Sequence, residues 1–337
     1  MNGEANAVQN PAGEIWLYIK EKLQASIPVL LLWVLDSEGS SPGRRGFKMA
    51  VAADGSFQGT IGGGIMEHKL VEKARMLLDR GEKNILIEHQ YHDKEHATDQ
   101  SGMICSGRQL NAFVPLLAKD QSVIDKIVQL RNDRKAYVVL RPEGVSVAEN
   151  SGSSRADLEY TTEEKWVYKE PIDQRPVIHI VGGGHVGLAL SELMSFLGFY
   201  IKIYDNRPGL NTMEQNRFAQ EKHIIDYSAI SEIIESNDAG YLVIMTFGYR
   251  DDKVVFRQLL DKNFFYAGMM GSEAKIATLF KELQEEGIDP WKWSKWSIPI
   301  GINIYSKTTR EIAVSIAAEI IREKNKHLPT GRTQREL

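Results

Sequence analysis

Runs of apolar residues alternate with polar, glycine-rich connections along most of the chain. The run 177–181 is apolar, and apolar residues then recur at helical spacing as far as Leu197. A second apolar run, 200–204, leads directly into Asp205. A strand, a tight turn, a helix and a second strand in this order are typical of the repeating unit of a parallel sheet.

The same kinds of pattern extend over the rest of the chain. Upstream, the spacing predicts strands at 28–35, 47–53, 56–59, 84–91, 109–117, 136–140 and 144–148, and helices at 14–26, 65–79 and 122–131. Downstream, it predicts strands at 223–226, 241–247 and 264–267, and helices at 227–235, 251–261, 272–286 and 309–323. The strict alternation downstream favours a doubly wound parallel sheet.

The turn after the run 177–181 carries the pattern G-x-G-x-x-G in Gly182, Gly184 and Gly187. Asp205 follows the last of these glycines by 18 residues. In a strand–turn–helix context this is the dinucleotide-binding fingerprint of Rossmann folds, in which the acid accepts a hydrogen bond from a ribose hydroxyl. His185, inside the turn, would face such a ligand. The alternative is that the glycines only allow close packing.

Two further residues belong to the same expected crevice. Gly271 and Ser272 follow the predicted strand 264–267, and the carboxyl ends of parallel strands line the ligand crevice. These residues would also serve as an ordinary turn and helix cap. If the crevice were catalytic, the chain would be an NAD(P)-dependent oxidoreductase, and Asp205 would favour NAD over NADP.

Length and polarity divide the chain into two domains. A chain of 337 residues exceeds what one core usually serves. The stretch 149–176 is polar without a sustained period, which predicts a linker that is partly disordered or contains short strands. We therefore expect an α/β protein with a mixed α/β domain at 1–148, this linker, a Rossmann-like domain at 177–324 and a polar tail at 325–337.

Composition narrows the classes of partner. The net charge of −4 argues against nonspecific nucleic-acid binding. The single cysteine excludes an intrachain disulfide and a multi-cysteine zinc site. The N-terminal residues lack the basic and apolar parts of a signal peptide, and the apolar run 28–35 is too short to span a bilayer. We expect a cytoplasmic protein without a membrane or nucleic-acid partner.

A second group of candidate residues lies in two upstream loops. Hydroxyls, guanidinium groups and free backbone N–H groups suit a phosphate or carboxylate. The candidates are Ser40, Ser41, Arg44, Arg45, Gly62, Gly63 and Gly64. The alternatives are a solvated basic loop and a sharp corner. Glu67, at the start of the next helix, would act as a general base or would only complement the helix dipole.

The only cysteine, Cys105, lies in a small-residue loop close to Arg108. A neighbouring arginine favours the thiolate, which suits a nucleophile or a soft-metal ligand. The alternative is a buried, inert thiol. A metal-like cluster precedes it, although without helical spacing, and consists of His89, His92, Asp93, His96 and Asp99.

Several of these segments together resemble the xanthine dehydrogenase accessory factor family (XdhC/CoxI-like). In the first domain the resemblance rests on GSSPGRRGFKMAV, DGSFQGTIGGGIME and GMICSG. In the second it rests on VIHIVGGGHVGLAL, YDNRP, YAGMMGS and PIGINI. Many members carry Cys-Gly-Gly where this chain has Cys105-Ser106-Gly107.

The resemblance implies a cofactor-maturation factor acting as a chaperone, not a turnover enzyme. Such proteins bind the molybdenum cofactor, which is molybdopterin or its dinucleotide form. They meet a cysteine desulfurase, deliver the sulfurated cofactor to a molybdenum hydroxylase apoenzyme, and are typically homodimers. The family cysteine involved in cofactor handling falls at Cys105, where it would contact the molybdenum. The two upstream loops would then hold the pterin phosphate, and the glycine turn at Gly182 a nucleotide.

Overall fold

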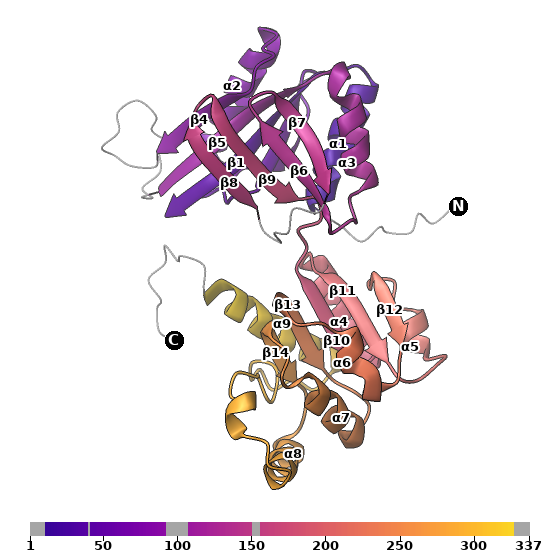
Figure 1. Cartoon of the computed structure of the whole chain (residues 1–337). Coiled ribbons are helices and arrows are strands. Elements are labelled where there is room, and N and C mark those ends of the chain that lie inside the picture. Colours follow the sequence, from indigo (N-terminus) through magenta and orange to yellow (C-terminus); the bar gives the residue numbers. More distant parts are fainter. Residues whose placement is uncertain (1–10, 40, 92–106, 150–155, 327–337) are drawn as a thin grey trace. The chain divides into compact units, whose positions relative to one another are not determined.

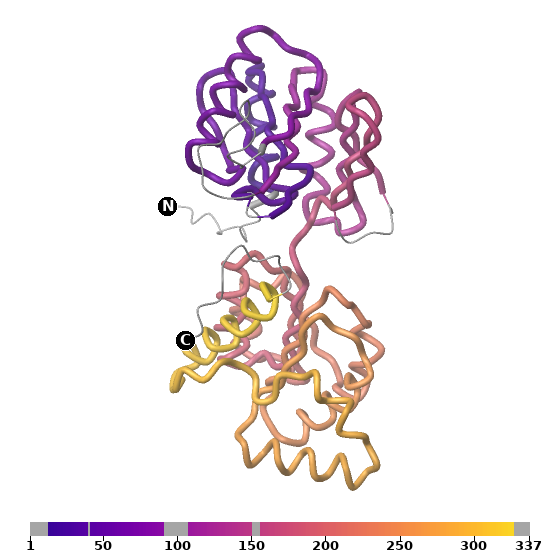
Figure 2. The backbone as a smooth tube through the Cα atoms, turned by 90° about the vertical axis from the view of Figure 1, so that its left-hand side faces the viewer, coloured from indigo at the N-terminus to yellow at the C-terminus, as the bar shows by residue number. Residues whose placement is uncertain are grey.

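The computed structural model describes residues 11–39, 41–91, 107–149 and 156–326. Within these residues the chain divides into two compact units, and the boundary between them falls between Gln174 and Arg175 (Figure 1, Figure 2). Each unit has its own sheets and its own buried core. No helix in the described part of the chain is long and apolar enough to cross a membrane.

An antiparallel five-stranded sheet forms the centre of the N-terminal unit, with strand order β3-β2-β1-β5-β4. Its strands are β1 (Val29–Gly39), β2 (Lys48–Ala52), β3 (Phe57–Thr60), β4 (Leu86–Tyr91) and β5 (Gly107–Leu116). Helix α2 (Gly64–Asp79) packs against one face of this sheet (Figure 1). Helices α1 (Pro11–Gln24) and α3 (Gln121–Gln129) belong to the core on the other face.

The central strand β1 is buried on both faces, as its unbroken apolar run predicts. Successive side chains of a strand point to opposite faces, so the run divides between two cores. Leu30, Leu32 and Val34 join the core under α2. Val29, Leu31, Trp33 and Leu35 join the core on the opposite face.

A second sheet of four antiparallel strands completes this unit, in the order β7-β6-β9-β8. The strands are β6 (Ala136–Arg141), β7 (Gly144–Glu149), β8 (Asp157–Thr162) and β9 (Lys165–Pro171). The short strands allowed at 149–176 are present as β8 and β9, but the prediction that this stretch is a linker between domains is wrong, because β9 pairs with β6 and the unit extends to Gln174. The alternate residues Trp166, Tyr168 and Glu170 of β9 are buried. Because Glu170 is charged, the sequence does not show the apolar alternation that would predict this strand.

Glu170 is buried because its carboxylate has charged and polar partners. Lys48 forms an ion pair with it, and the Tyr168 hydroxyl donates to Glu170 Oε2 at 2.8 Å. Trp33 Nε1 donates to the same oxygen at 3.3 Å. Burial and the neighbouring carboxylate raise the pKa of Tyr168. The pairing of Lys48 on β2 with Glu170 on β9 joins the two sheets of the unit.

The C-terminal unit is a doubly wound parallel sheet, which confirms the predicted fold class. The strand order is β12-β11-β10-β13-β14, and every pair is parallel. The strands are β10 (Val177–Val181), β11 (Tyr200–Asp205), β12 (Glu221–Ile224), β13 (Asn237–Ile244) and β14 (Phe264–Met269). The order reverses between β10 and β13, which is where ligands bind in open α/β sheets.

Helices cover both faces of this sheet (Figure 1). Helices α4 (His185–Phe196) and α9 (Thr309–Lys326) belong to the core on one face. Helices α6 (Ile230–Ile233), α7 (Tyr249–Leu259) and α8 (Glu273–Glu285) belong to the other. The remaining short elements are α5 (Asn211–Glu214) and 3₁₀ turns at Ala118–Asp120, Tyr227–Ala229 and Pro290–Trp293. The helix predicted at 227–235 is thus divided into a 3₁₀ turn and the short α6.

Candidate functional site

The glycine turn between β10 and α4 forms part of the carboxyl edge of the parallel sheet. Gly182 has φ +124°, and a Cβ at this position would lie 2.1 Å from the carbonyl oxygen of Met245. A Cβ at Gly187 would lie 2.1 Å from the carbonyl oxygen of Gly182. Packing therefore requires both glycines. Gly184 differs, because a Cβ there would meet no atom within 4 Å, and it leaves space in front of the turn.

Asp205, at the end of β11, is fully buried. Its Oδ2 accepts hydrogen bonds from Gly183 N at 2.7 Å and Arg207 Nη2 at 2.8 Å. Its Oδ1 accepts from Arg207 N at 3.0 Å and Arg207 Nε at 2.8 Å. Burial opposes the ionisation of Asp205, but the bonds from Arg207 and Gly183 outweigh it and lower the pKa of the carboxyl. The carboxylate thus fixes the glycine turn and the guanidinium at once.

Arg207 also contacts an aromatic ring from the neighbouring strand connection. Its guanidinium carbon lies 5.2 Å from the centroid of Phe247, just beyond the end of β13. The Phe247 side chain is 85% exposed. Sequence reasoning missed both residues as site candidates. The arginine two residues after the acid in YDNRP was the available signal, because a nearby arginine accommodates a ribose phosphate in such folds.

The other predicted residues of this edge have simpler surroundings. His185 is exposed at the first position of α4. Ser272 caps α8 by accepting a hydrogen bond from Lys275 N at 3.4 Å. A Cβ at Gly271 would lie 3.2 Å from Cγ1 of Ile276, in the same helix. Ser272 therefore acts as the helix cap that the sequence predicts.

In the N-terminal unit, the two glycine-rich loops pack directly against each other. A Cβ at Gly43 would lie 2.3 Å from the carbonyl oxygen of Ile61. A Cβ at Gly62 would lie 2.5 Å from Gly43 N, and Gly62 has φ +126°. The loops that sequence analysis grouped therefore meet backbone to backbone, and glycine is required at the contact.

The Glu67 carboxylate binds the loop at 60–63, the second of these two loops. Its Oε2 accepts hydrogen bonds from Ile61 N at 2.9 Å, Gly63 N at 3.0 Å and Thr60 Oγ1 at 2.5 Å. The N–H groups of the turn that were expected to bind an external anion thus bind a carboxylate of the same chain. Gly64, the next residue, begins α2 with φ +74°.

Ser41 belongs to a chain of buried polar side chains. Its hydroxyl donates to Gln109 Oε1 at 2.7 Å, and Gln109 Nε2 donates to Asn111 Oδ1 at 2.7 Å. Asn111 Nδ2 in turn donates to Gln90 Oε1 at 3.3 Å. The Ser41 side chain is thus turned into the sheet. Ser40 and Cys105 lie outside the described residues.

A cavity of about 380 Å³ lies between the two sheets of this unit. It is lined by Asp36, Ser37, Arg45, His89, Arg108, Leu110, Leu158 and Tyr160. Arg45 forms an ion pair with Asp36, and Arg108 with Glu38. Arg44 is exposed and donates to the Gly39 carbonyl at 3.3 Å. Gly39 and Gly107, beside Ser40 and the Cys105 segment in sequence, are register partners on β1 and β5.

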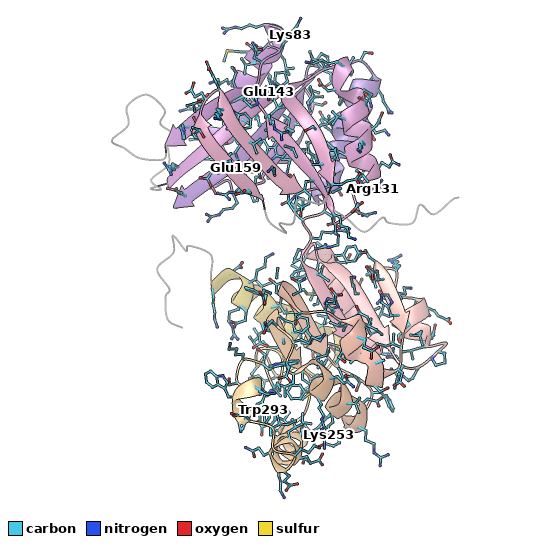
Figure 3. The ribbon with its side chains drawn as sticks, in the orientation of Figure 1. Lys83, Arg131, Glu143, Glu159, Lys253 and Trp293 are labelled. Carbon is cyan, nitrogen blue, oxygen red and sulfur yellow. The ribbon has the colours of Figure 1, made fainter. Side chains whose placement is uncertain are left out.

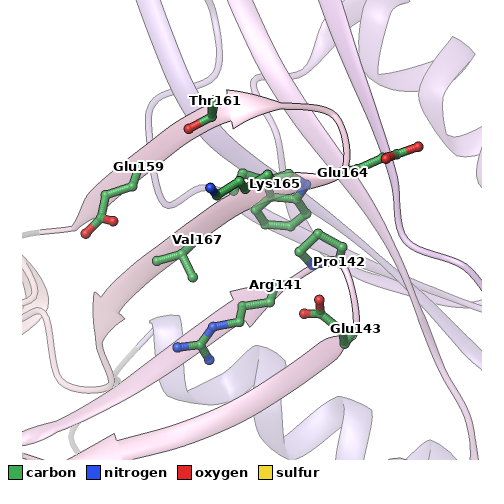
Figure 4. A pocket seen from close by; sticks show the side chains of 9 residues that line it. Arg141, Pro142, Glu143, Glu159, Thr161, Glu164, Lys165 and Val167 are labelled. Atoms are coloured by element: carbon green, nitrogen blue, oxygen red, sulfur yellow. The ribbon is translucent and has the colours of Figure 1, made fainter.

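Two more hollows lie on the same unit. One of about 320 Å³ has charged residues of both signs on its walls, including Arg141, Glu143 and Glu159 (Figure 3, Figure 4). Another, of about 400 Å³, includes Phe47 and Lys48. Among the described residues, no group of three or more His, Cys, Asp or Glu side chains is placed to hold a metal ion. His92, Asp93, His96 and Asp99 lie outside that range.

Family models match both units. The model described as the XdhC Rossmann domain matches residues 178–320, and the model of the XdhC and CoxI family matches residues 23–90. The chain belongs to the XdhC and CoxI family. The Rossmann domain of the matched model agrees with the parallel sheet and glycine turn of the C-terminal unit.

Two curated relatives share part of their length with the chain. It is 23% identical over 305 residues to the uncharacterised protein YqeB of Escherichia coli, covering 90% of this chain and 44% of YqeB. It is 27% identical over 166 residues to a probable xanthine dehydrogenase subunit of Bacillus subtilis, covering 48% of this chain and 46% of that protein. The chain thus spans less than half the length of the curated relatives it matches.

A solved structure shares the fold. The crystal structure of a xanthine dehydrogenase from Bacillus halodurans superposes with a TM-score of 0.64 at 21% identity. The match covers 94% of this chain and 98% of that one.

Proposed function

We propose that this family member is an accessory factor for a xanthine dehydrogenase-type molybdenum hydroxylase, binding the molybdenum cofactor and delivering it to the apoenzyme. Family membership and the name of the Bacillus subtilis relative support the link to xanthine dehydrogenase. The observation that carries a ligand-binding role is the cavity between the sheets of the N-terminal unit, which contains two arginines and a histidine.

The residues of this cavity fit the anionic part of such a cofactor. Arg45 and Arg108 supply guanidinium groups, which bind phosphate through paired hydrogen bonds. Their ion pairs with Asp36 and Glu38 are partly exposed, and ion pairs of this kind contribute little to stability. A phosphate can therefore compete for the two arginines at low cost. The cavity volume lies within the range of small-molecule sites.

The glycine turn after β3 fits an external phosphate less well. Glu67 already accepts from the N–H groups of Ile61 and Gly63. A bound phosphate would have to displace this carboxylate. We therefore assign the phosphate to Arg45 and Arg108, with the loops that contain Ser41, Arg44 and Gly62–Gly64 as the scaffold of the cavity.

Cys105 is the residue proposed to meet the molybdenum centre. A thiolate is a soft ligand, and a soft ligand suits such a metal. Gly39 directly precedes Ser40, and Gly107 follows Cys105 by two residues. These two glycines are register partners on β1 and β5, and this pairing supports the assignment. The proposal extends to the expected partners, which are a cysteine desulfurase, the apoenzyme and a second copy of this chain in a homodimer.

Cofactor retention tests the proposal. The full chain, loaded with molybdenum cofactor, is passed through a desalting column, and molybdenum and pterin are measured in the protein fraction. The Cys105→Ala variant is expected to lose bound cofactor and to fail in activating the apoenzyme, whereas the neighbouring Ser106→Ala variant is the matched control. Unchanged retention and activation in Cys105→Ala would remove the central claim.

A further inference from the structure

The carboxyl edge of the parallel sheet contains a charged pair whose geometry decides which nucleotide it accepts. We propose that the C-terminal unit binds a nucleotide with a 2′-phosphorylated ribose, as in NADP, with Arg207 on the phosphate and Phe247 under the base. This inference goes beyond the proposed function and is independent of Cys105. Asp205 taken alone predicts the opposite preference, because an acid at this position normally binds an unmodified ribose.

The first step is that Asp205 has no remaining acceptor capacity. An ionised carboxylate offers about four lone-pair sites. Gly183 N and three nitrogens of Arg207 donate to them at distances between 2.7 and 3.0 Å. Since the side chain is also fully buried, a ribose hydroxyl could donate to it only by displacing one of these bonds. The usual basis for NAD preference is therefore missing.

The second step is that Arg207 retains one complete edge for a ligand. A guanidinium has five N–H donors in a rigid fork. Asp205 takes Nε and one hydrogen of Nη2, which together form the side edge of the group. One hydrogen of Nη1 and the second hydrogen of Nη2 form the end edge, and the other Nη1 hydrogen points toward Cδ. Two parallel N–H groups on that edge match a phosphate, and the side chain is 36% exposed.

The third step is that the pair is rigid and electrically balanced. The backbone N–H of Arg207 and its side chain both bind Asp205, so the guanidinium has a fixed direction. Arg207 also compensates the negative charge of Asp205, which would otherwise repel a ribose phosphate. Asp205 thereby acts as a positioning residue for Arg207.

The fourth step is the aromatic surface beside the pair. Phe247 is 85% exposed and lies 5.2 Å from the Arg207 guanidinium. It follows β13, and Arg207 follows β11, so the two residues lie beyond the carboxyl ends of the strands on either side of β10. A nucleotide base can stack on an exposed phenyl ring. Its ribose phosphate would then be within reach of the guanidinium.

A pair of ligands that differ only in the 2′-phosphate tests the inference. Adenosine 2′,5′-bisphosphate and adenosine 5′-monophosphate are titrated into the full chain by calorimetry. The bisphosphate is expected to bind about tenfold or more tightly than the monophosphate. Equal affinities, tighter binding of the monophosphate, or no binding of either ligand at millimolar concentration would overturn the proposal.

Variants separate the roles of the two side chains. Arg207→Ala is expected to lose the preference for the bisphosphate, and Phe247→Ala to weaken both ligands by a similar factor. Arg217→Ala is the matched control, because Arg217 also stacks on a phenylalanine, Phe218. Arg217 lies on the segment before β12, which pairs with the start of β11 and not with its carboxyl end. A preference that survives in Arg207→Ala would contradict the assignment. None of these outcomes depends on molybdenum retention, so failure here leaves the Cys105 proposal testable by itself.

Discussion

Glu67 accepts a hydrogen bond from the backbone N–H of Gly63 across the second glycine-rich loop, at 3.0 Å. The same carboxylate oxygen binds Ile61 N and the Thr60 hydroxyl. An acid in the first turn of a helix normally complements the helix dipole. Here it also closes the preceding loop, which places the loop against Pro42 and Gly43.

Replacing Glu67 by alanine should therefore destabilise the N-terminal unit. Three donors would lose their acceptor, and because water can reach these partly exposed groups the expected loss is about 1 kcal/mol. The free energy of unfolding is measured in urea for the full chain. Glu72→Ala is the matched control, because Glu72 lies on the same helix and only pairs with the neighbouring Arg75 at the surface. Equal stability of the two variants would mean that the loop does not depend on Glu67.

The neighbouring glycines Gly62 and Gly63 should respond differently to alanine. Both have positive φ, which costs a residue with a side chain about 1–3 kcal/mol. Only at Gly62 would the added Cβ also meet backbone atoms, at 2.5 Å from Gly43 N. Gly62→Ala should thus lower the melting temperature more than Gly63→Ala. The reverse order would show that the two loops are not packed as described.

The buried pair of Lys48 and Glu170 predicts a coupled response. Glu170→Ala should cost about 3–5 kcal/mol, because it leaves the Lys48 ammonium buried without a counter-charge. The double variant Lys48→Met, Glu170→Leu should recover much of this loss, since no charge is then buried. Urea unfolding followed by tryptophan fluorescence measures both. Additive losses in the double variant would contradict the pairing.

Asp205 should make the melting temperature of the protein fall at acid pH. Its pKa is lower in the folded chain than in the unfolded chain, where it is about 4. Its stabilisation is then fully present above that value and is lost as the pH falls through the folded-state pKa. The melting temperatures of the natural chain and of Asp205→Asn should therefore differ most near neutral pH and converge in acid. A difference that stays constant from pH 7 to pH 3 would exclude this linkage.

Local patterns were sufficient for most of the fold. The unbroken apolar runs of β1 and β10 predict central strands, because a strand buried on both faces needs no polar side. The pattern failed at β9, where the buried Glu170 interrupts the apolar alternation. Its burial depends on Lys48, more than a hundred residues away in the sequence, and no local period reveals such a partner.

The sequence by itself determined the α/β class and the position of both glycine-rich turns, because these depend on short-range spacing of apolar and glycine residues. Its ordered motifs also carried the resemblance to the XdhC and CoxI family. Only the tertiary structure decided which candidate groups have hydrogen-bonding capacity left for a ligand. The acceptor sites of Asp205 are filled by Gly183 and Arg207, and Glu67 already holds the turn at Gly63. The physical reason is that a residue's type gives the number of its donors and acceptors, whereas the fold determines which of them are already used.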